Sequence, residues 1–293
     1  MIDLHTHSSA SDGKLSPADS ARYAVSHNLT VWALTDHDTV SGLHEAALVC
    51  KDAGITFVPG IEITVEWPTG EFHLLGQGLT SCSPELAEVI DDLQESRRER
   101  NERIIEKMAA DGIHTSQDEL KAIFGVSQLG RPHFADFLVQ KGVVRKRQDA
   151  FDKYLAQGRP WFTHHSGADL EQAVAAIKSS GGLPVLAHPL SLYVSWGKIE
   201  DVLRGIVDRG IEGIEAWHPG ARVGEAMRLE ALAHKLGCFV TGGSDFHGEK
   251  VRADRHLGFS SGKFKIPDRF WEEELKPQLI QVHGNEDLQF AVT

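Results

Sequence analysis

The sequence of 293 residues has few cysteines and no long hydrophobic run. Its three cysteines, Cys50, Cys82 and Cys238, lie far apart and form neither a CxxC pair nor an even-numbered disulfide framework. No apolar stretch reaches the roughly 18 residues that a membrane span needs. The first residues, MIDLHTHSSA, lack the basic and apolar regions of a signal peptide. These absences predict a protein of the reducing cytoplasm with no membrane partner.

Positive charge is also scarce. The chain has 30 Lys and Arg residues against 42 Asp and Glu residues, which gives a formal net charge of −12. This balance argues against a surface for duplex DNA, which would need a basic stripe. A small anionic substrate is still compatible with it, because bound metal ions reverse the local field. Hydrophobic residues make up 41% of the chain, as in globular proteins, and the unusual component is the 16 histidines.

Short apolar runs rich in β-branched residues alternate with amphipathic segments over most of the chain. The expected strands are 2–7, 31–36, 56–65, 72–76, 183–188, 213–217 and 239–243. The expected helices between them include 17–27, 43–53, 170–179, 199–208 and 224–236. Strands that alternate with helices predict an α/β fold with a largely parallel sheet. The number of such units favours a barrel over an open sheet.

One region, 84–158, has no convincing strand and is rich in Arg, Glu, Lys and Gln. It predicts several helices, including a long charged helix over 86–111. We interpret it as a helical insertion that caps one end of the barrel, although an ordinary solvated helical surface would show the same charge density. The barrel would then comprise residues 1–83 and 159–293.

The first expected strand ends in His5-Thr6-His7. Alternate residues of a strand point to the same face, so the two imidazoles converge while Thr6 faces away. Two converging imidazoles can bind one metal ion. Because an HxH pair is weak evidence on its own, its meaning depends on the other strands.

Polar residues of metal-ligand type follow or interrupt further apolar runs. They are Thr35-Asp36-His37-Asp38, Glu62 between two isoleucines, His73 between Phe72 and Leu74, His188 before Pro189, and Ser244-Asp245-Phe246-His247. We expect each at the carboxyl end of its strand, where barrel active sites are assembled. Any one histidine also fits a hydrogen-bonded core residue, but six such sites at equivalent strand ends predict a shared metal cluster. Asp3 and Asp36 are candidates to orient ligand histidines; Asp3 also fits an ordinary strand-end carboxylate.

Together these motifs resemble the PHP (polymerase and histidinol phosphatase) family, which is related to the amidohydrolases. The residues that carry the resemblance are His5-Thr6-His7, Ser11-Asp12-Gly13, Thr35-Asp36-His37-Asp38, Gly60-Ile61-Glu62, His73, Ala187-His188-Pro189 and Ser244-Asp245-Phe246-His247. The resemblance implies a distorted (β/α)7 barrel, with the helical insertion as a subdomain, that binds two or three divalent metals. No ligand position of the family is missing.

The ligands implied by the resemblance fall into three sets: His5, His7, Glu62 and Asp245; Glu62, His73 and His188; and Asp12, His37 and His247. Asp12, His37, Glu62 and Asp245 are also expected to take part in catalysis. Imidazole and carboxylate donors without thiolates suit Mn²⁺, Fe²⁺ or Zn²⁺, and we expect Mn²⁺. His218, at the end of another strand, matches no metal position and is a candidate substrate contact or general acid.

Transfer of a phosphoryl group needs positive groups around its oxygens. Two segments of the insertion could supply them, and the candidate substrate contacts are Arg97, Arg98, Asn101, Arg131 and His133. Arg97 and Asn101 share a helix face with Arg98 beside it, and Arg131 could bind a phosphate bidentately. The same arginines could instead pair with neighbouring glutamates on a solvated surface. His164 and His165 follow the insertion and are more simply loop residues.

The same two segments resemble a TrpH-like subgroup of the family, whose members remove the 3′-phosphate from nucleoside 3′,5′-bisphosphates. Some members also degrade short RNA from a 5′-monophosphate end. The resemblance therefore implies a phosphoric ester hydrolase that converts, for example, adenosine 3′,5′-bisphosphate to AMP, with a small nucleotide or a short RNA 5′ end as its partner. Three alternatives stay open: a histidinol-phosphate-type phosphatase, an amidohydrolase-like C–N hydrolase and a non-catalytic scaffold module.

Overall fold

A single sheet of seven strands, in the order β1 to β7, forms the centre of the structure. The computed structural model describes residues 1–284 except 69, 165, 250 and 253. The strands are β1 (Ile2–Asp3), β2 (Val31–Leu34), β3 (Thr56–Trp67), β4 (Gly70–Gln77), β5 (Leu183–Leu186), β6 (Gly213–Trp217) and β7 (Phe239–Gly242). Just beyond β1 and β7, a parallel bridge between Thr6 and Phe246 joins the two ends of the sheet. The expected distorted α/β barrel is confirmed.

The direction of β4 differs from the expected, largely parallel arrangement. β4 is antiparallel to both of its neighbours, β3 and β5, whereas the other neighbouring pairs are parallel. Only two residues separate β3 from β4, and a parallel connection needs a crossover of about a dozen residues or more. The chain therefore turns back as a hairpin. As a result, the beginning of β4 lies at the end of the barrel where the parallel strands finish.

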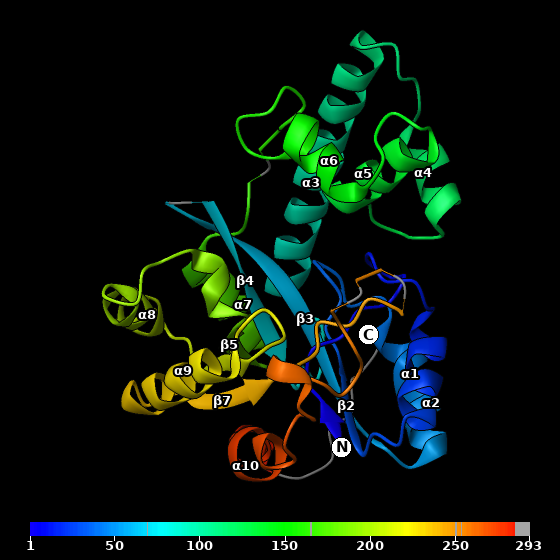
Figure 1. Cartoon of the computed structure of the whole chain (residues 1–293). Coiled ribbons are helices and arrows are strands. Elements are labelled where there is room, and N and C mark those ends of the chain that lie inside the picture. The colour runs from blue at the N-terminus through cyan, green and yellow to red at the C-terminus, as the bar shows by residue number, and fades with distance from the viewer. Residues whose placement is uncertain (69, 165, 250, 253, 285–293) are drawn as a thin grey trace.

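Helices form the outer layer of the barrel (Figure 1). Those anticipated from the sequence are α1 (Pro17–Ser26), α2 (Leu43–Ala53), α7 (Leu170–Ser179), α8 (Ile199–Val207) and α9 (Val223–Lys235). Helix α8 illustrates why they pack there, because its buried residues Ile199, Leu203 and Ile206 lie on one face at helical spacing. The sequence reading missed the last helix, α10 (Lys276–His283), which follows a π-helical turn, η4 (Phe270–Leu275).

A second group of helices lies beyond the β3–β4 hairpin (Figure 1). It contains α3 (Pro84–Ala110), α4 (Gln117–Phe124), α5 (Arg131–Gln140), α6 (Arg147–Ala150) and the π-helical turn η1 (Phe151–Leu155). These helices enclose a separate core built around Met108, Phe134 and Trp161. The first turns of α3 instead bury Leu86 and Leu93 in the barrel core. The separate packing thus begins within α3 rather than at residue 84, and it extends past residue 158.

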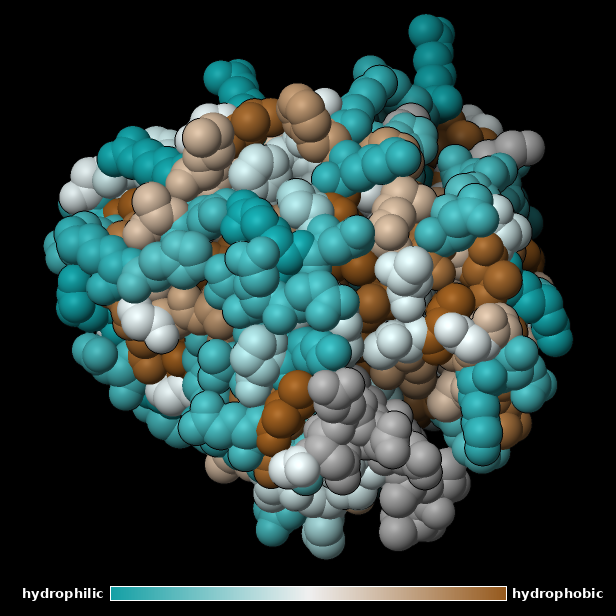
Figure 2. All heavy atoms as spheres, turned by 90° about the horizontal axis from the view of Figure 1, so that it is seen from below, coloured by the Kyte–Doolittle hydropathy of each residue, from teal (hydrophilic) through white to brown (hydrophobic). Residues whose placement is uncertain are grey.

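The molecular surface is mixed in character. The face seen from below combines hydrophilic residues with separate hydrophobic patches (Figure 2). The large exposed hydrophobic side chains come from different elements: Leu48, Ile123, Tyr193, Met227, Phe264 and Val282. Among the described residues, no helix is both long and apolar enough to cross a membrane.

Candidate metal centre

His5 and His7 project into the barrel from the segment that follows β1. Both side chains are buried, and their Nε2 atoms lie 3.1 Å apart. The intervening Thr6 turns the other way, where its Oγ1 donates a hydrogen bond to the backbone oxygen of Ala33. The alternation expected from the sequence therefore brings the two imidazoles to one point.

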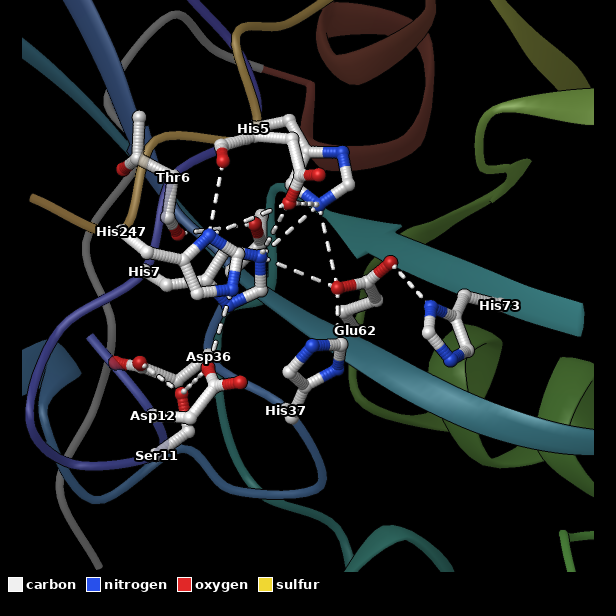
Figure 3. A network of polar contacts seen from close by, with 12 residues as sticks. His5, Thr6, His7, Ser11, Asp12, Asp36, His37, Glu62, His73 and His247 are labelled. Atoms are coloured by element: carbon white, nitrogen blue, oxygen red, sulfur yellow. Dashed lines mark hydrogen bonds and ion pairs between the residues drawn. The ribbon is translucent and has the colours of Figure 1, made fainter. Parts of the chain in front are cut away.

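Glu62 is the centre of the site (Figure 3). Its Oε1 lies 2.9 Å from His73 Nδ1 and 3.0 Å from His188 Nε2. The other oxygen, Oε2, has three more imidazole nitrogens within 3.2 Å, from His5, His7 and His37. A single buried carboxylate therefore faces five imidazoles. Each of its oxygens faces a different group of them, which is the arrangement that a ligand bridging two metals requires.

The position of Glu62 and His73 along their strands differs from the expectation that each ligand sits at a carboxyl end. Glu62 lies in the middle of β3, opposite His37 in a parallel bridge, because β3 continues into the hairpin. His73 lies near the beginning of β4 and pairs with Thr64. The antiparallel direction of β4 is what brings His73 to the same end of the barrel as the other ligands.

Asp12, His37 and His247 form the other side of the site. His247 Nε2 lies 3.2 Å from Asp12 Oδ1, and the ring of His7 stacks on that of His247 at a centroid distance of 4.0 Å. Asp245 Oδ1 lies 3.4 Å from His7 Nε2. The structure thus gathers all nine residues predicted as metal ligands: His5, His7, Asp12, His37, Glu62, His73, His188, Asp245 and His247. We call these nine residues the histidine–carboxylate cluster.

The chemistry of this cluster fits divalent cations. Donor atoms of eight of the nine residues, all except His188, form three groups, each with all atoms within 4.8 Å of one another: His7, Asp12, His37 and His247; His5, His7 and Asp245; and His37, Glu62 and His73. His7 Nδ1, His37 Nδ1 and Glu62 Oε2 are buried, and although the last two lie 3.1 Å apart, none of the three makes a contact with hydrogen-bond geometry. Buried polar atoms are normally satisfied. Metal ions bound between these buried nitrogen and oxygen atoms would give them the partners they lack. In the three sets implied by the family resemblance only Glu62 is shared. In the structure, His7 and His37 each belong to two groups.

The electrostatics keep the carboxylates ionised. Burial alone would raise the pKa of Glu62, but the imidazoles of His37 and His5 hold it well below its usual range. The pKa of Asp12 is likewise held low, against the effect of burial, by His247 and His37. Burial would lower the pKa of His7, yet the carboxylates of Asp245 and Glu62 outweigh it and raise that pKa to about 10. Positive charge at this point is thus strongly favoured, and a metal ion can supply it in place of protons.

Glu215, in the middle of β6, is a functional candidate that the sequence reading missed. It is buried, its Oε1 lies 2.9 Å from His5 Nδ1, and its Oε2 accepts a hydrogen bond from the backbone nitrogen of His188 at 2.9 Å. A carboxylate on the second ring nitrogen fixes the orientation of a metal-binding imidazole. The sequence does contain a sign of this role, because Glu215 lies between the apolar residues Ile214 and Ala216, just as Glu62 lies between two isoleucines.

Asp3 and Asp36 do not orient ligand rings as expected. Asp3 accepts hydrogen bonds from the backbone nitrogens of Ser244 and Gly258 and so fastens the chain beyond β7 to β1. Asp36 accepts from the hydroxyls of Ser8 and Ser11, and this shapes the loop that carries Asp12. Both carboxylates thus hold chain segments near the ligands, and among the described residues neither is hydrogen-bonded to an imidazole nitrogen.

A cavity of about 1330 Å³ opens over the cluster. Three of the candidate substrate contacts, Arg97, Arg131 and His133, line it. Arg131 donates a hydrogen bond to Glu71 Oε1 at 2.7 Å and lies over the ring of Phe162, 5.7 Å from its centroid. Arg97 pairs with the buried carboxylate of Asp38.

His133 and His218, which also lines the cavity, have clear hydrogen-bonding states. His133 Nδ1 accepts from the backbone nitrogen of Gly130 at 2.9 Å, so its Nε2 can donate toward a ligand. His218 Nδ1 accepts from Gly220 N, and its Nε2 lies 3.3 Å from Asp245 Oδ2. Because both ring nitrogens of His218 are engaged, the geometry favours a role in positioning Asp245 over one as the general acid.

Two predicted substrate contacts do not reach the cavity. Arg98 is 51% exposed and pairs with Glu95 and Glu102 on the outer face of α3, as the alternative interpretation of the helix anticipated. Asn101 is buried, and its amide nitrogen donates to the backbone oxygen of Leu129, so it supports the loop before Arg131. Arg100, one residue earlier on α3, lines the cavity instead.

The loop after β7 contributes two arginines that no motif indicated. Arg252 Nη1 lies 3.1 Å and Arg255 Nε 3.3 Å from Asp245 Oδ2, and both residues line the cavity. Of the loop histidines, His164 also lines the cavity, whereas His165 lies outside the described residues.

Comparisons with known proteins show which proteins this chain is similar to. The family model described as the PHP domain matches residues 3–157. A relative from Chromobacterium violaceum, named 3′,5′-nucleoside bisphosphate phosphatase, is 34% identical over 93% of this chain and 95% of its own length. A relative from Haemophilus influenzae, named 5′-3′ exoribonuclease, is 32% identical over 84% of this chain and 89% of its own length.

Solved structures show the same similarity over the full fold. A protein from Chromobacterium violaceum, described as an amidohydrolase, superposes with a TM-score of 0.82 and 32% identity over 93% of this chain and 95% of its own. A protein from Bifidobacterium adolescentis, described as a metal-dependent phosphoesterase, gives a TM-score of 0.81 and 28% identity over 94% of this chain and 95% of its own.

Proposed function

The chain belongs to the PHP domain family, and from that premise we propose that it is a metal-dependent phosphoesterase that removes the 3′-phosphate from nucleoside 3′,5′-bisphosphates. The observation that carries this proposal is the joint presence of the Glu62-centred cluster and of Arg131 in one cavity. The cluster suits the reacting phosphoryl group, and the arginine suits a second anion. A substrate with two phosphates, on the 3′ and 5′ oxygens, matches both. The names of the relatives from Chromobacterium violaceum and Haemophilus influenzae support the same choice.

Bound divalent metals would lower the pKa of a coordinated water and neutralise the phosphoryl oxygens. The residues of the histidine–carboxylate cluster would hold these ions. Imidazole and carboxylate donors without thiolates suit Mn²⁺, Fe²⁺ or Zn²⁺, and of these we propose Mn²⁺. The three cysteines are free thiols, which supports a reducing compartment, and we propose the cytoplasm.

The roles of the other cavity residues follow from their chemistry. Arg131 would bind the 5′-phosphate, since its guanidinium presents donors in a planar fork. His133 Nε2 would donate to the same phosphate or to its ester oxygen. Arg97 is held by Asp38 and would add positive charge without moving. The helices of 84–158 would cover the cavity and exclude bulk water from the reacting phosphorus.

A short RNA with a 5′-phosphate is a second candidate substrate. The cavity of about 1330 Å³ exceeds the roughly 300–1,000 Å³ of typical small-ligand pockets. Cleavage of such an RNA would break the same bond to the 3′ oxygen beside a nucleotide whose 5′-phosphate lies at Arg131. One site would therefore serve both substrates.

The proposal predicts a selective effect of Arg131→Ala. Loss of the guanidinium leaves Glu71 facing the 5′-phosphate, so kcat/KM for adenosine 3′,5′-bisphosphate should fall about tenfold or more, the usual effect of losing a charged hydrogen bond. Turnover of a simple phosphomonoester such as glycerol phosphate should change far less. Arg98→Ala is the matched control, because Arg98 points away from the cavity. Equal losses on both substrates would show that Arg131 does not recognise a second phosphate.

A further inference from the structure

The turn after β5 connects the cluster to the wall of the cavity. It begins at His188, whose Nε2 faces Glu62, and continues as the 3₁₀ turn η2 (Pro189–Leu192) to Tyr193. Leu190, Tyr193 and Val194 all line the cavity. A residue in this turn is therefore close in sequence to a predicted metal ligand and faces the space that a substrate would fill.

Hydrogen bonds within the turn and two buried side chains hold it in place. His188 Nδ1 lies 3.0 Å from Ser191 Oγ, and the backbone nitrogen of Tyr193 donates to Leu190 O at 3.1 Å. The side chains of Pro189 and Leu192 are buried. Tyr193 therefore extends from a rigid support, so a ligand that contacts it need not order the backbone.

Two unfavourable features coincide at Tyr193. Its backbone has a φ of +52°, a left-handed conformation that costs energy in a residue other than glycine. Its side chain is 94% exposed, whereas the other two tyrosines stack on neighbours: Tyr23 on Phe246 and Tyr154 on Trp161. Within the described residues, no ring contact of Tyr193 is present. Backbone strain and an unpacked aromatic ring in a cavity wall are typical of a residue whose partner is a ligand.

We propose that Tyr193 is a specificity-determining residue that stacks on the nucleobase of the bound nucleotide. Aromatic side chains stack on the faces of bases, and because each base has a π-face, such a contact distinguishes nucleotides from phosphate esters without a base rather than one base from another. Leu190 and Val194 beside Tyr193 provide apolar surface that suits the face of a base. This inference rests on the proposed function. It assigns a contact to the nucleobase, the part of the substrate that neither the cluster nor Arg131 recognises.

The test is the affinity of Mn²⁺-loaded protein for AMP and for ribose 5-phosphate, measured by titration calorimetry. Both ligands carry the 5′-phosphate and lack the scissile 3′-phosphate, so only the base distinguishes them and no turnover is involved. Wild-type protein should bind AMP more tightly. Tyr193→Ala should weaken AMP binding about tenfold or more, the usual effect of losing a base stack, with a much smaller change for ribose 5-phosphate. Tyr193→Phe and Tyr193→Trp should retain the preference for AMP.

Phe264→Ala is the matched control, because Phe264 is another exposed aromatic residue and does not line the cavity. The stacking proposal is overturned if wild-type protein binds the two ligands equally, or if Tyr193→Ala weakens both to the same extent. Failure of the proposed function would look different: wild-type protein would release no phosphate from a nucleoside 3′,5′-bisphosphate, whatever its preference between AMP and ribose 5-phosphate. The large exposure of Tyr193 means that its truncation removes little packing, so the variants should fold.

Discussion

Glu62→Gln is expected to abolish most of the phosphatase activity while the protein stays folded. The amide has nearly the same shape as the carboxylate but is neutral, and its nitrogen cannot bind a metal. Five imidazole nitrogens face this side chain within 3.2 Å, so the change acts on two metal positions at once. Phosphate release should fall by roughly a hundredfold or more, the scale of losing one preorganised charge-stabilising group. Metal analysis should show fewer than the two or three ions per chain expected in the wild type.

Glu66→Gln is the control for this experiment. Glu66 lies on the same strand, β3, and is exposed, so the substitution changes the same charge outside the cluster. Its activity and metal content should match those of the wild type. Normal metal content and activity in Glu62→Gln would mean that Glu62 is not a ligand, and the three-group arrangement would then be wrong.

Glu215→Gln is expected to weaken metal binding without removing a ligand. The glutamate fixes His5 through Nδ1 and holds the backbone nitrogen of His188, where the chain has a φ of +28°. Loss of a carboxylate that orients a ligand imidazole typically lowers metal affinity roughly 10- to 100-fold. A competition titration with a metal-binding dye would measure the change, and excess Mn²⁺ should restore much of the activity.

Restoration by excess metal separates a positioning role from a direct one. Glu212→Gln is a suitable control, since Glu212 lies just before β6 and pairs with Lys178 at the surface. If Glu215→Gln kept full metal affinity but lost activity at every Mn²⁺ concentration, Glu215 would act on the substrate rather than on His5 and His188.

The barrel and the gathering of its histidines and carboxylates at one site could be predicted because they depend on local patterns. The alternation of apolar runs with helices and the placement of histidines such as His5 and His7 follow from strand geometry, which is a property of neighbouring residues. Glu62 was recognisable because a carboxylate between isoleucines is unusual in a buried strand. The same pattern around Glu215, between Ile214 and Ala216, carried equal information.

Other features could not be predicted because they depend on long-range packing. The antiparallel direction of β4 is different, because the connection after β3 is too short for a parallel crossover. Whether an arginine on α3 faces the cavity or the solvent depends on how that helix lies across the barrel, so the sequence does not show that Arg98 faces the solvent and Arg100 lines the cavity. The contacts of Arg252 and Arg255 with Asp245 depend on a loop with no regular periodicity.

The most direct test of the central claim is the regiochemistry of phosphate release from adenosine 3′,5′-bisphosphate. Chelator-treated protein should be inactive, and the same protein with Mn²⁺ restored should release phosphate and form adenosine 5′-monophosphate, identified by phosphorus NMR. Amide substrates assayed in parallel should not be hydrolysed. Formation of adenosine 3′-monophosphate, or no phosphate release by protein shown to contain its metals, would contradict the account.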